Sequence, residues 1–222
     1  MNIFLDFDGP LIDNSLRLYS LYANILHSFN RKPLPLNSYW NLKRDCIKEE
    51  EILKRTGIND PNIIQQYLAK RLEDIELRQY LQLNKVVDGC VDALRFFKEH
   101  GRPILVTTRQ NRENLFWELE QKNLSPYFSK ILCGFDASLP ASEVKIKMIF
   151  KEGCMDGAHG IIIGDTEAEI LCGKRMHFFT IAISGGIRSR DYLISMNPDR
   201  IFDNIVQVVN EWNSILKEMK QS

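Results

Sequence analysis

The stretch Asn2-Ile3-Phe4-Leu5-Asp6-Phe7-Asp8-Gly9-Pro10 decides the fold. It opens with an apolar run of residues that favour strands, and two carboxylates then stand two positions apart ahead of a glycine. Side chains alternate between the faces of a strand, so Asp6 and Asp8 would point the same way. Asp and Gly also favour turns for local reasons, and glycine lets the chain turn sharply there. We predict a buried strand with two carboxylates at its carboxyl end, the edge where open α/β sheets bind ligands.

The composition is that of a globular chain with no charge bias. Of the 222 residues, 44% are hydrophobic, which is enough for one sizeable core or for a core domain with a smaller appendage. Basic and acidic residues both number 29, so the formal net charge is zero. This balance gives no reason to expect binding to nucleic acid or to a membrane surface.

The cysteines favour a reducing compartment. There are five, at Cys46, Cys90, Cys133, Cys154 and Cys172. The odd number and wide spacing argue against a disulfide framework or a zinc site, so we predict buried, reduced thiols in a cytoplasmic protein. The first apolar run is interrupted by carboxylates and does not read as a signal peptide, and no apolar stretch approaches the length of a membrane span.

Strands and helices alternate through most of the sequence. Beyond the first strand we predict strands at 103–107, 130–133, 161–165, 178–183 and 200–202, and helices that begin near residues 90, 111, 142, 167 and 205, the last one reaching 219. This alternation predicts a Rossmann-like parallel sheet with helices on both faces. The segment 14–85 has helical periodicity and no convincing strand. We therefore predict an α/β domain made of residues 1–13 and 86–222, and an inserted all-helical domain at 14–85.

Several predicted strands end in polar side chains. These are Asp6 with Asp8, Thr107 with Thr108, and Asp165 after Gly164. The carboxyl ends of parallel strands share one edge, so these residues should converge. Lys145 and Lys147 begin a helix between the last two strands and could bring a cation to the same edge. Carboxylates that outnumber nearby cations favour a hard metal ion, and Mg²⁺ prefers oxygen ligands.

At this point the residues resemble the haloacid dehalogenase-like hydrolase superfamily, and especially its phosphoglycolate phosphatase-like members. The motifs that carry the resemblance are Asp6 to Pro10, Thr107 at a strand end, Lys145 ahead of a helix, Gly164-Asp165-Thr166-Glu167-Ala168-Glu169, and Gly185-Gly186-Ile187-Arg188-Ser189. Each motif is weak alone, but four in the right order on the right elements are a strong signal. The resemblance covers essentially the whole chain, and the helical segment 14–85 stands where such members carry a cap domain.

Two positions depart from the family pattern. Pro10 stands where Thr or Val is usual, and it lacks an amide hydrogen, which matters only if that N–H would be bonded. Glu169 stands where the second acidic residue of the fourth motif is normally Asp. Its longer side chain could still reach a metal ion, directly or through water.

The resemblance implies a Mg²⁺-dependent phosphatase that acts on a small phosphorylated metabolite, a phosphate monoester. Asp6 would attack phosphorus to form an aspartyl-phosphate, and Asp8 would serve as general acid and base. Mg²⁺ would be held by Asp6, Asp165 and the backbone carbonyl of Asp8, with Glu169 completing the site. Thr107, Thr108 and Lys145 would bind the phosphoryl oxygens.

The choice between Lys145 and Lys147 stays open, although an apolar residue four positions after Lys145 favours that lysine. Arg109 and Arg44 are further candidates for contacts with the substrate, Arg44 from the cap. A solvated surface charge is an equally good interpretation for Arg109 and a better one for Arg44.

The same residues also have to be weighed against other functions. A dehalogenase or a phosphonate hydrolase would need no acid at the position of Asp8, so both are disfavoured. A phosphosugar mutase keeps every motif. A non-catalytic module that binds phosphate or a partner, with a decayed site, finds support only in Pro10 and Glu169. We expect a monomer or a small homo-oligomer.

Overall fold

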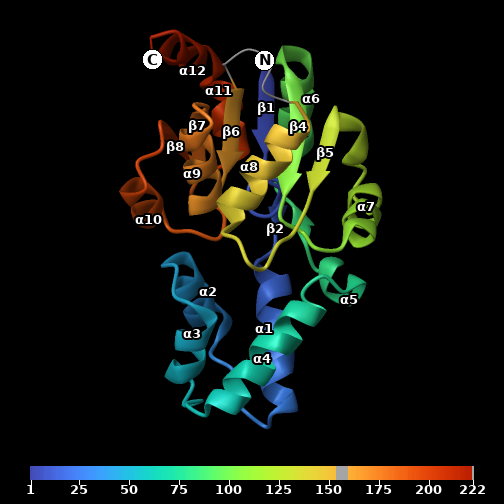
Figure 1. Cartoon of the computed structure of the whole chain (residues 1–222), viewed down its shortest axis with the longest axis vertical. Coiled ribbons are helices and arrows are strands. Elements are labelled where there is room, and N and C mark those ends of the chain that lie inside the picture. The colour runs from blue at the N-terminus through green and yellow to red at the C-terminus, as the bar shows by residue number, and fades with distance from the viewer. Residues whose placement is uncertain (154–159, 222) are drawn as a thin grey trace. The chain divides into compact units, whose positions relative to one another are not determined.

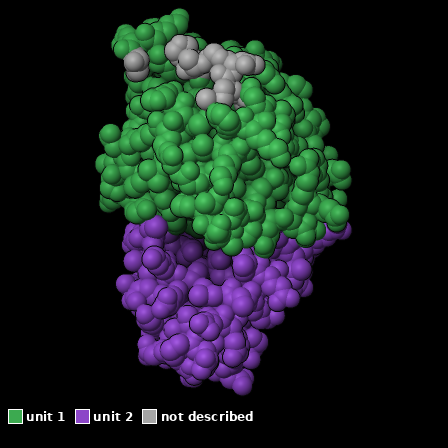
Figure 2. Space-filling model, viewed as in Figure 1, with its two compact units in different colours: residues 1–13, 86–222 green, residues 14–85 purple. Residues whose placement is uncertain are grey.

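The computed structural model describes residues 1–153 and 160–221, and Cys154 therefore lies outside the described residues. The chain forms two compact units (Figure 2). Unit 1 comprises residues 1–13 and 86–222, and unit 2 comprises residues 14–85. Each is described below by itself.

Unit 1 is built on a six-stranded sheet in the order β5-β4-β1-β6-β7-β8, in which every neighbouring pair is parallel (Figure 1). The strands are β1 (Asn2–Leu5), β4 (Arg102–Thr107), β5 (Lys130–Cys133), β6 (Gly160–Gly164), β7 (Phe179–Ile183) and β8 (Arg200–Phe202). The parallel sheet predicted from the alternating pattern is confirmed. Two short strands, β2 (Ile12–Asp13) and β3 (Lys85–Val86), form a separate two-stranded sheet.

The strands are buried on both faces, as expected of a parallel sheet between helical layers. Ile3 and Leu5 pack into one cluster, while Phe4 between them packs into another on the opposite face. Helices α8 (Ala141–Lys151) and α9 (Glu167–Arg175) cover the Phe4 face, where Ile149 and Cys172 contribute to the core (Figure 1). The other face is covered by α6 (Cys90–His100), α7 (Arg112–Gln121), α11 (Ile205–Asn210) and α12 (Trp212–Met219).

Two details of unit 1 differ from the sequence prediction. The single helix predicted at 205–219 is two helices, because the backbone leaves helical geometry at Glu211 and turns Trp212 onto Phe97, with ring centroids 5.4 Å apart. The short helices α10 (Arg190–Ser195) and the 3-10 turn η1 (Ser125–Tyr127) were not predicted. Ser189 caps α10 by accepting from the amide of Tyr192.

Unit 2 contains α1 (Ser15–Ser28), α2 (Leu36–Arg44), α3 (Glu49–Arg55), α4 (Pro61–Asp74) and α5 (Arg78–Leu81). Its centre holds three buried tyrosines from different helices. The rings of Tyr22 and Tyr39 stack with centroids 4.3 Å apart, and Tyr67 meets Tyr22 edge-on at 6.4 Å. Such pairs add to the stability gained by burying the rings.

A charged cluster around Glu49 ties the helices of unit 2 together. Its carboxylate pairs with Lys43 at 2.8 Å and Arg71 at 3.2 Å, and it accepts from the hydroxyls of Tyr39 and Tyr67. Burial opposes ionisation of Glu49, but the charges of Arg71 and Lys43 outweigh it and lower the pKa from 4.5 to about 2. The cluster links α2, α3 and α4.

We expect Glu49→Gln to destabilise unit 2, because it leaves the buried Lys43 and the half-buried Arg71 without their anion. Removing one partner of a buried pair costs about 3–5 kcal/mol in comparable cases. Urea unfolding at pH 7 measures the loss, and Glu50→Gln, which disturbs only an exposed pair with Lys54, is the matched control. Because the pKa of Glu49 is lowered by folding, its contribution is complete above about pH 4.5 and fades as pH falls towards 2. A loss that did not shrink over this pH range would contradict the role of the Glu49 charge.

The cysteines and helices agree in part with the expectations above. Cys90 and Cys172 are buried free thiols, whereas Cys46 and Cys133 are only half-buried. Burial raises the pKa of Cys90 and of Cys172 to about 12, so these two thiols stay protonated. Among the described residues, no helix is both long enough and apolar enough to cross a bilayer.

Candidate active site

The central strands end side by side. Leu5 at the end of β1 pairs in register with Leu105 on β4 and with Ile163 on β6. Asp6 and Asp165 therefore emerge from neighbouring strands at the carboxyl edge of the sheet, where ligands bind in this architecture. Segments more than 150 positions apart in sequence are thus brought together by the parallel topology.

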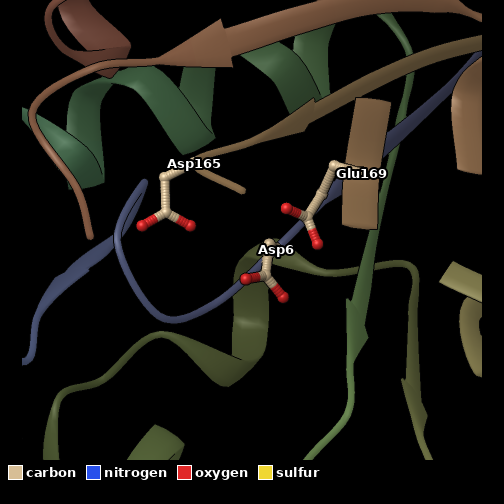
Figure 3. Close-up of side chains that lie close together, drawn as sticks. All are labelled: Asp6, Asp165 and Glu169. Carbon is tan, nitrogen blue, oxygen red and sulfur yellow. The ribbon is translucent and has the colours of Figure 1, made fainter. Parts of the chain in front are cut away.

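Three buried carboxylates meet at this edge. Asp6, Asp165 and Glu169 each have an oxygen within 4.8 Å of the others (Figure 3). The amide of Ile187 donates to Asp165 Oδ2 at 2.6 Å, while Asp165 Oδ1 is buried with no hydrogen-bond partner among the described residues. A buried carboxylate oxygen without a partner is costly and calls for a cation or a donor.

Two glycines make room for Asp165. A Cβ at Gly9 would lie 2.0 Å from Asp165 Oδ2, and one at Gly186 would lie 2.1 Å from the same atom. Gly9 also has a φ of +99°, which L side chains rarely adopt. The backbone at Gly9 and at Gly186 therefore lies so close to the Asp165 carboxylate that a side chain would not fit at either position.

Lys145 lies among the carboxylates and is itself buried. Its ammonium is 2.6 Å from Asp6 Oδ1 and 2.6 Å from Glu169 Oε1, and it donates to the carbonyl of Val106 at 3.0 Å. An ammonium has three donors, and these three oxygens account for all of them. Lys147 is exposed on the same helix, so Lys145 is the lysine that reaches Asp6.

One ammonium does not satisfy three buried carboxylates. Burial raises the pKa of Asp6 to about 7 even though Lys145 opposes the shift, and Glu169 and Asp8 add to it. Burial, followed by the charges of Asp6 and Glu169, also raises the pKa of Asp165 well above its usual range. A divalent cation would relieve this repulsion, so the all-oxygen donor set and the unpartnered Asp165 oxygen fit Mg²⁺.

Glu169 is held from two sides. One of its oxygens binds Lys145, and the other accepts from the amide of Thr166 at 3.1 Å and from its hydroxyl at 2.7 Å. The Thr166 side chain also accepts from the amide of Ala168, and Thr166 and Glu169 together form a capping box at the start of α9. The glutamate at this departure from the family pattern therefore links the helix start to Lys145.

The turn after β1 tolerates Pro10. Its backbone hydrogen bonds run from Gly9 N to Ile12 O at 2.8 Å and from Leu11 N and Ile12 N to Phe7 O. The amides on both sides of Pro10 thus make the turn, which explains how proline is accommodated.

The remaining predicted residues lie in different surroundings. Thr107 is buried at the end of β4 and Thr108 is half-buried after it. Arg109 does not face open solvent: its guanidinium makes two hydrogen bonds to Asp8, at 2.7 and 3.0 Å. Arg44 is half-buried at the end of α2 in unit 2, and its contact with a substrate stays a prediction.

Sequence reasoning did not predict three contacts at this edge, although two of them involve residues of the quoted motifs. Glu118 on α7 binds Arg109, the amide of Ile187 binds Asp165, and Arg188 pairs with Glu167 through two hydrogen bonds of 2.8 and 3.0 Å. Glu118 lies three positions after Leu115 and therefore on the same apolar face of α7. A charged residue on such a face is the sequence signal that could have indicated its buried contact.

Comparisons with known proteins agree with this geometry. The family model described as haloacid dehalogenase-like hydrolase matches residues 3–183. A pyrophosphatase of Oceanobacillus iheyensis is 22% identical over 93% of this chain and 94% of its own length. A phosphoglycolate phosphatase of Pseudomonas fluorescens is 20% identical over 93% of this chain and 78% of its own. The structure of a putative phosphatase from Clostridium difficile superposes with a TM-score of 0.77, at 18% identity, over 95% of this chain and 96% of that one.

Proposed function

The chain belongs to the haloacid dehalogenase-like hydrolase family, and on that premise we propose that it is a Mg²⁺-dependent phosphatase of a small phosphorylated metabolite. The observation that carries the proposal is the buried group of Asp6, Asp165 and Glu169 around Lys145 at the carboxyl edge of the sheet. The names of the relatives, pyrophosphatase and phosphoglycolate phosphatase, support a small phosphorylated substrate.

The cation would be held by Asp6, Asp165 and the backbone carbonyl of Asp8, with Glu169 completing the acidic group. When bound, Mg²⁺ would neutralise charge on the phosphoryl group and lower its repulsion from the Asp6 carboxylate. Asp165 supports this assignment best, because one of its oxygens is buried without a hydrogen-bond partner among the described residues.

Asp6 is the proposed nucleophile. One of its oxygens attacks phosphorus, a new O–P bond forms, and the bond to the leaving oxygen breaks. Asp8 gives a proton to that leaving oxygen. In the second step Asp8 takes a proton from water, which attacks the aspartyl-phosphate and releases inorganic phosphate.

Thr107, Thr108 and Lys145 are proposed to bind the phosphoryl oxygens. The three donors of Lys145 are all directed at protein oxygens. A contact with phosphate would therefore share or replace one of these bonds. Before a phosphoryl group binds, Lys145 holds Asp6 and Glu169 in place.

We expect the wild-type protein to hydrolyse p-nitrophenyl phosphate with Mg²⁺ and to lose that activity in EDTA, with recovery on adding Mg²⁺. The measurement is the release of inorganic phosphate. A phosphosugar mutase would instead transfer phosphate between hydroxyls and release little of it. Binding of phosphate without turnover would instead indicate a non-catalytic module. If the protein is active, a panel of phosphorylated metabolites would identify its substrate.

We propose that unit 2 acts as a cap that selects the substrate, with Arg44 as its candidate contact. Arg44→Ala is expected to raise KM for the true substrate and to leave KM for p-nitrophenyl phosphate nearly unchanged, since only the former has a group for Arg44 to bind. Steady-state kinetics with both substrates test this, and equal effects on both, or none on either, would remove Arg44 from the site.

A further inference from the structure

Arg109 joins two carboxylates of unit 1 that lie far apart in sequence. Its Nε donates to Asp8 Oδ2 at 2.7 Å, and one terminal nitrogen donates both to Asp8 Oδ1 at 3.0 Å and to Glu118 Oε2 at 3.2 Å. The side chains of Arg109 and Glu118 are 5% and 1% exposed, whereas that of Asp8 is 21% exposed. The arginine is thus anchored inside the protein and presents Asp8 towards the edge of the sheet.

The fold explains why this geometry is fixed. Arg109 follows β4 by two residues, and Asp8 lies in the turn after the neighbouring β1. The guanidinium lies over the ring of Phe7, 5.6 Å from its centroid. Glu118 is buried on α7 next to Leu119, so its carboxylate has little freedom to move. A planar guanidinium that binds a carboxylate through two nitrogens fixes its orientation as well as its position.

We infer that Arg109, anchored by Glu118, is a positioning residue that orients the Asp8 carboxylate for proton transfer. This inference rests on the proposed phosphatase function. A proton donor must lie within hydrogen-bond reach of the leaving oxygen, and small errors in its placement are costly to the rate. Both oxygens of Asp8 bind Arg109 in this structure, so proton transfer requires the longer bond, to Oδ1 at 3.0 Å, to open. Oδ2 then stays on Nε of Arg109 while Oδ1 carries the proton.

The proton balance follows from this arrangement. As the Asp6 oxygen forms its bond to phosphorus and the bond to the leaving oxygen breaks, the Asp8 oxygen that has left Arg109 gives its proton to the leaving group. The same oxygen takes a proton from water when the aspartyl-phosphate is hydrolysed. Arg109 exchanges no proton in either step, since a guanidinium stays charged throughout.

The test compares leaving groups that need different help from an acid. An alkyl phosphate such as glycerol 2-phosphate loses a basic alkoxide and depends on Asp8, whereas p-nitrophenyl phosphate loses a weakly basic phenolate and depends on it little. We expect Arg109→Ala to lower kcat/KM for the alkyl ester by about 10-fold or more, part of the usual 10²–10⁴-fold contribution of a positioned acid, and to affect the aryl ester far less. Arg112→Ala, an exposed arginine on the following helix, is the matched control and should change neither.

Two further variants keep the inference falsifiable if Arg109→Ala folds poorly because the buried Glu118 loses its arginine partner. Arg109→Ala with Glu118→Gln removes both charges together, and Arg109→Lys keeps the charge without the two-nitrogen geometry. Both should show the same selective loss with the alkyl ester. In a background of Asp8→Asn, a further change at Arg109 should have no additional effect on the alkyl ester.

Equal losses with both esters would overturn the inference and would indicate that Arg109 binds the phosphoryl group or supports the site as a whole. Losses that multiply with those of Asp8→Asn would overturn it too. These outcomes are distinct from failure of the proposed function, in which the wild-type protein itself would release no phosphate with Mg²⁺.

Discussion

Asp6→Asn is expected to abolish turnover while leaving the protein folded. The carboxylate at position 6 forms the bond to phosphorus in the proposed mechanism, and an amide is not a comparable nucleophile. The amide is also a weaker ligand for a hard cation. Lys145 keeps its bonds to Glu169 and to the carbonyl of Val106 in the variant, so we expect unit 1 to hold its structure.

Release of inorganic phosphate from p-nitrophenyl phosphate measures the effect, and Asp13→Asn, at an exposed carboxylate in the same segment, is the control. Acid quenching after incubation with substrate labelled at phosphorus should leave label on the wild-type protein and none on the variant. If Asp6→Asn kept more than a few per cent of the wild-type rate, covalent catalysis by this residue would be ruled out.

The sheet and its edge were predictable because they depend on local patterns that a sequence displays directly. Apolar runs of strand length alternate with segments of helical periodicity, and this alternation predicts a parallel sheet covered by helices. In such a sheet the strand ends share an edge by topology alone. The meeting of Asp6 and Asp165 therefore needed no knowledge of side-chain packing.

The choice between Lys145 and Lys147 was harder to make from sequence, because it depends on which face of the helix packs against the sheet. Lys145 and Ile149 are four positions apart and so share a face, and Ile149 belongs to the core. That spacing favours Lys145 over Lys147, but the reach of its ammonium to Asp6 depends on how α8 packs, which periodicity does not determine. The break at Glu211 was also missed, because it accompanies a tertiary contact of Trp212 with Phe97 that periodicity does not reveal.

The bonding partners of individual side chains were the part of the site that was hardest to predict from the sequence. The capping box of Thr166 and Glu169 could be recognised from the spacing Thr-x-x-Glu. That Glu169 also binds Lys145 is a tertiary contact without a local signature. The same holds for Arg109, whose bond to Asp8 crosses 101 positions of sequence.

Asp8→Asn is expected to slow turnover by on the order of 100-fold or more, the usual size of a positioned acid–base contribution, while leaving Mg²⁺ binding largely intact. The two effects separate because the proposed metal contact of residue 8 is its backbone carbonyl, which the substitution does not alter. The side chain is engaged elsewhere: both of its oxygens bind Arg109, and it is not one of the three clustered carboxylates.

Calorimetric titration with Mg²⁺ and single-turnover phosphate release from an alkyl ester measure the two properties independently. An asparagine can still accept one hydrogen bond from Arg109, so the turn after β1 should survive and a loss of rate should reflect the missing proton transfer. If Asp8→Asn instead lost Mg²⁺ binding and kept its chemical rate at saturating Mg²⁺, the side chain would be a metal ligand. Asp8 would then have to be replaced as the acid, and the pair with Arg109 would serve to hold a ligand in place.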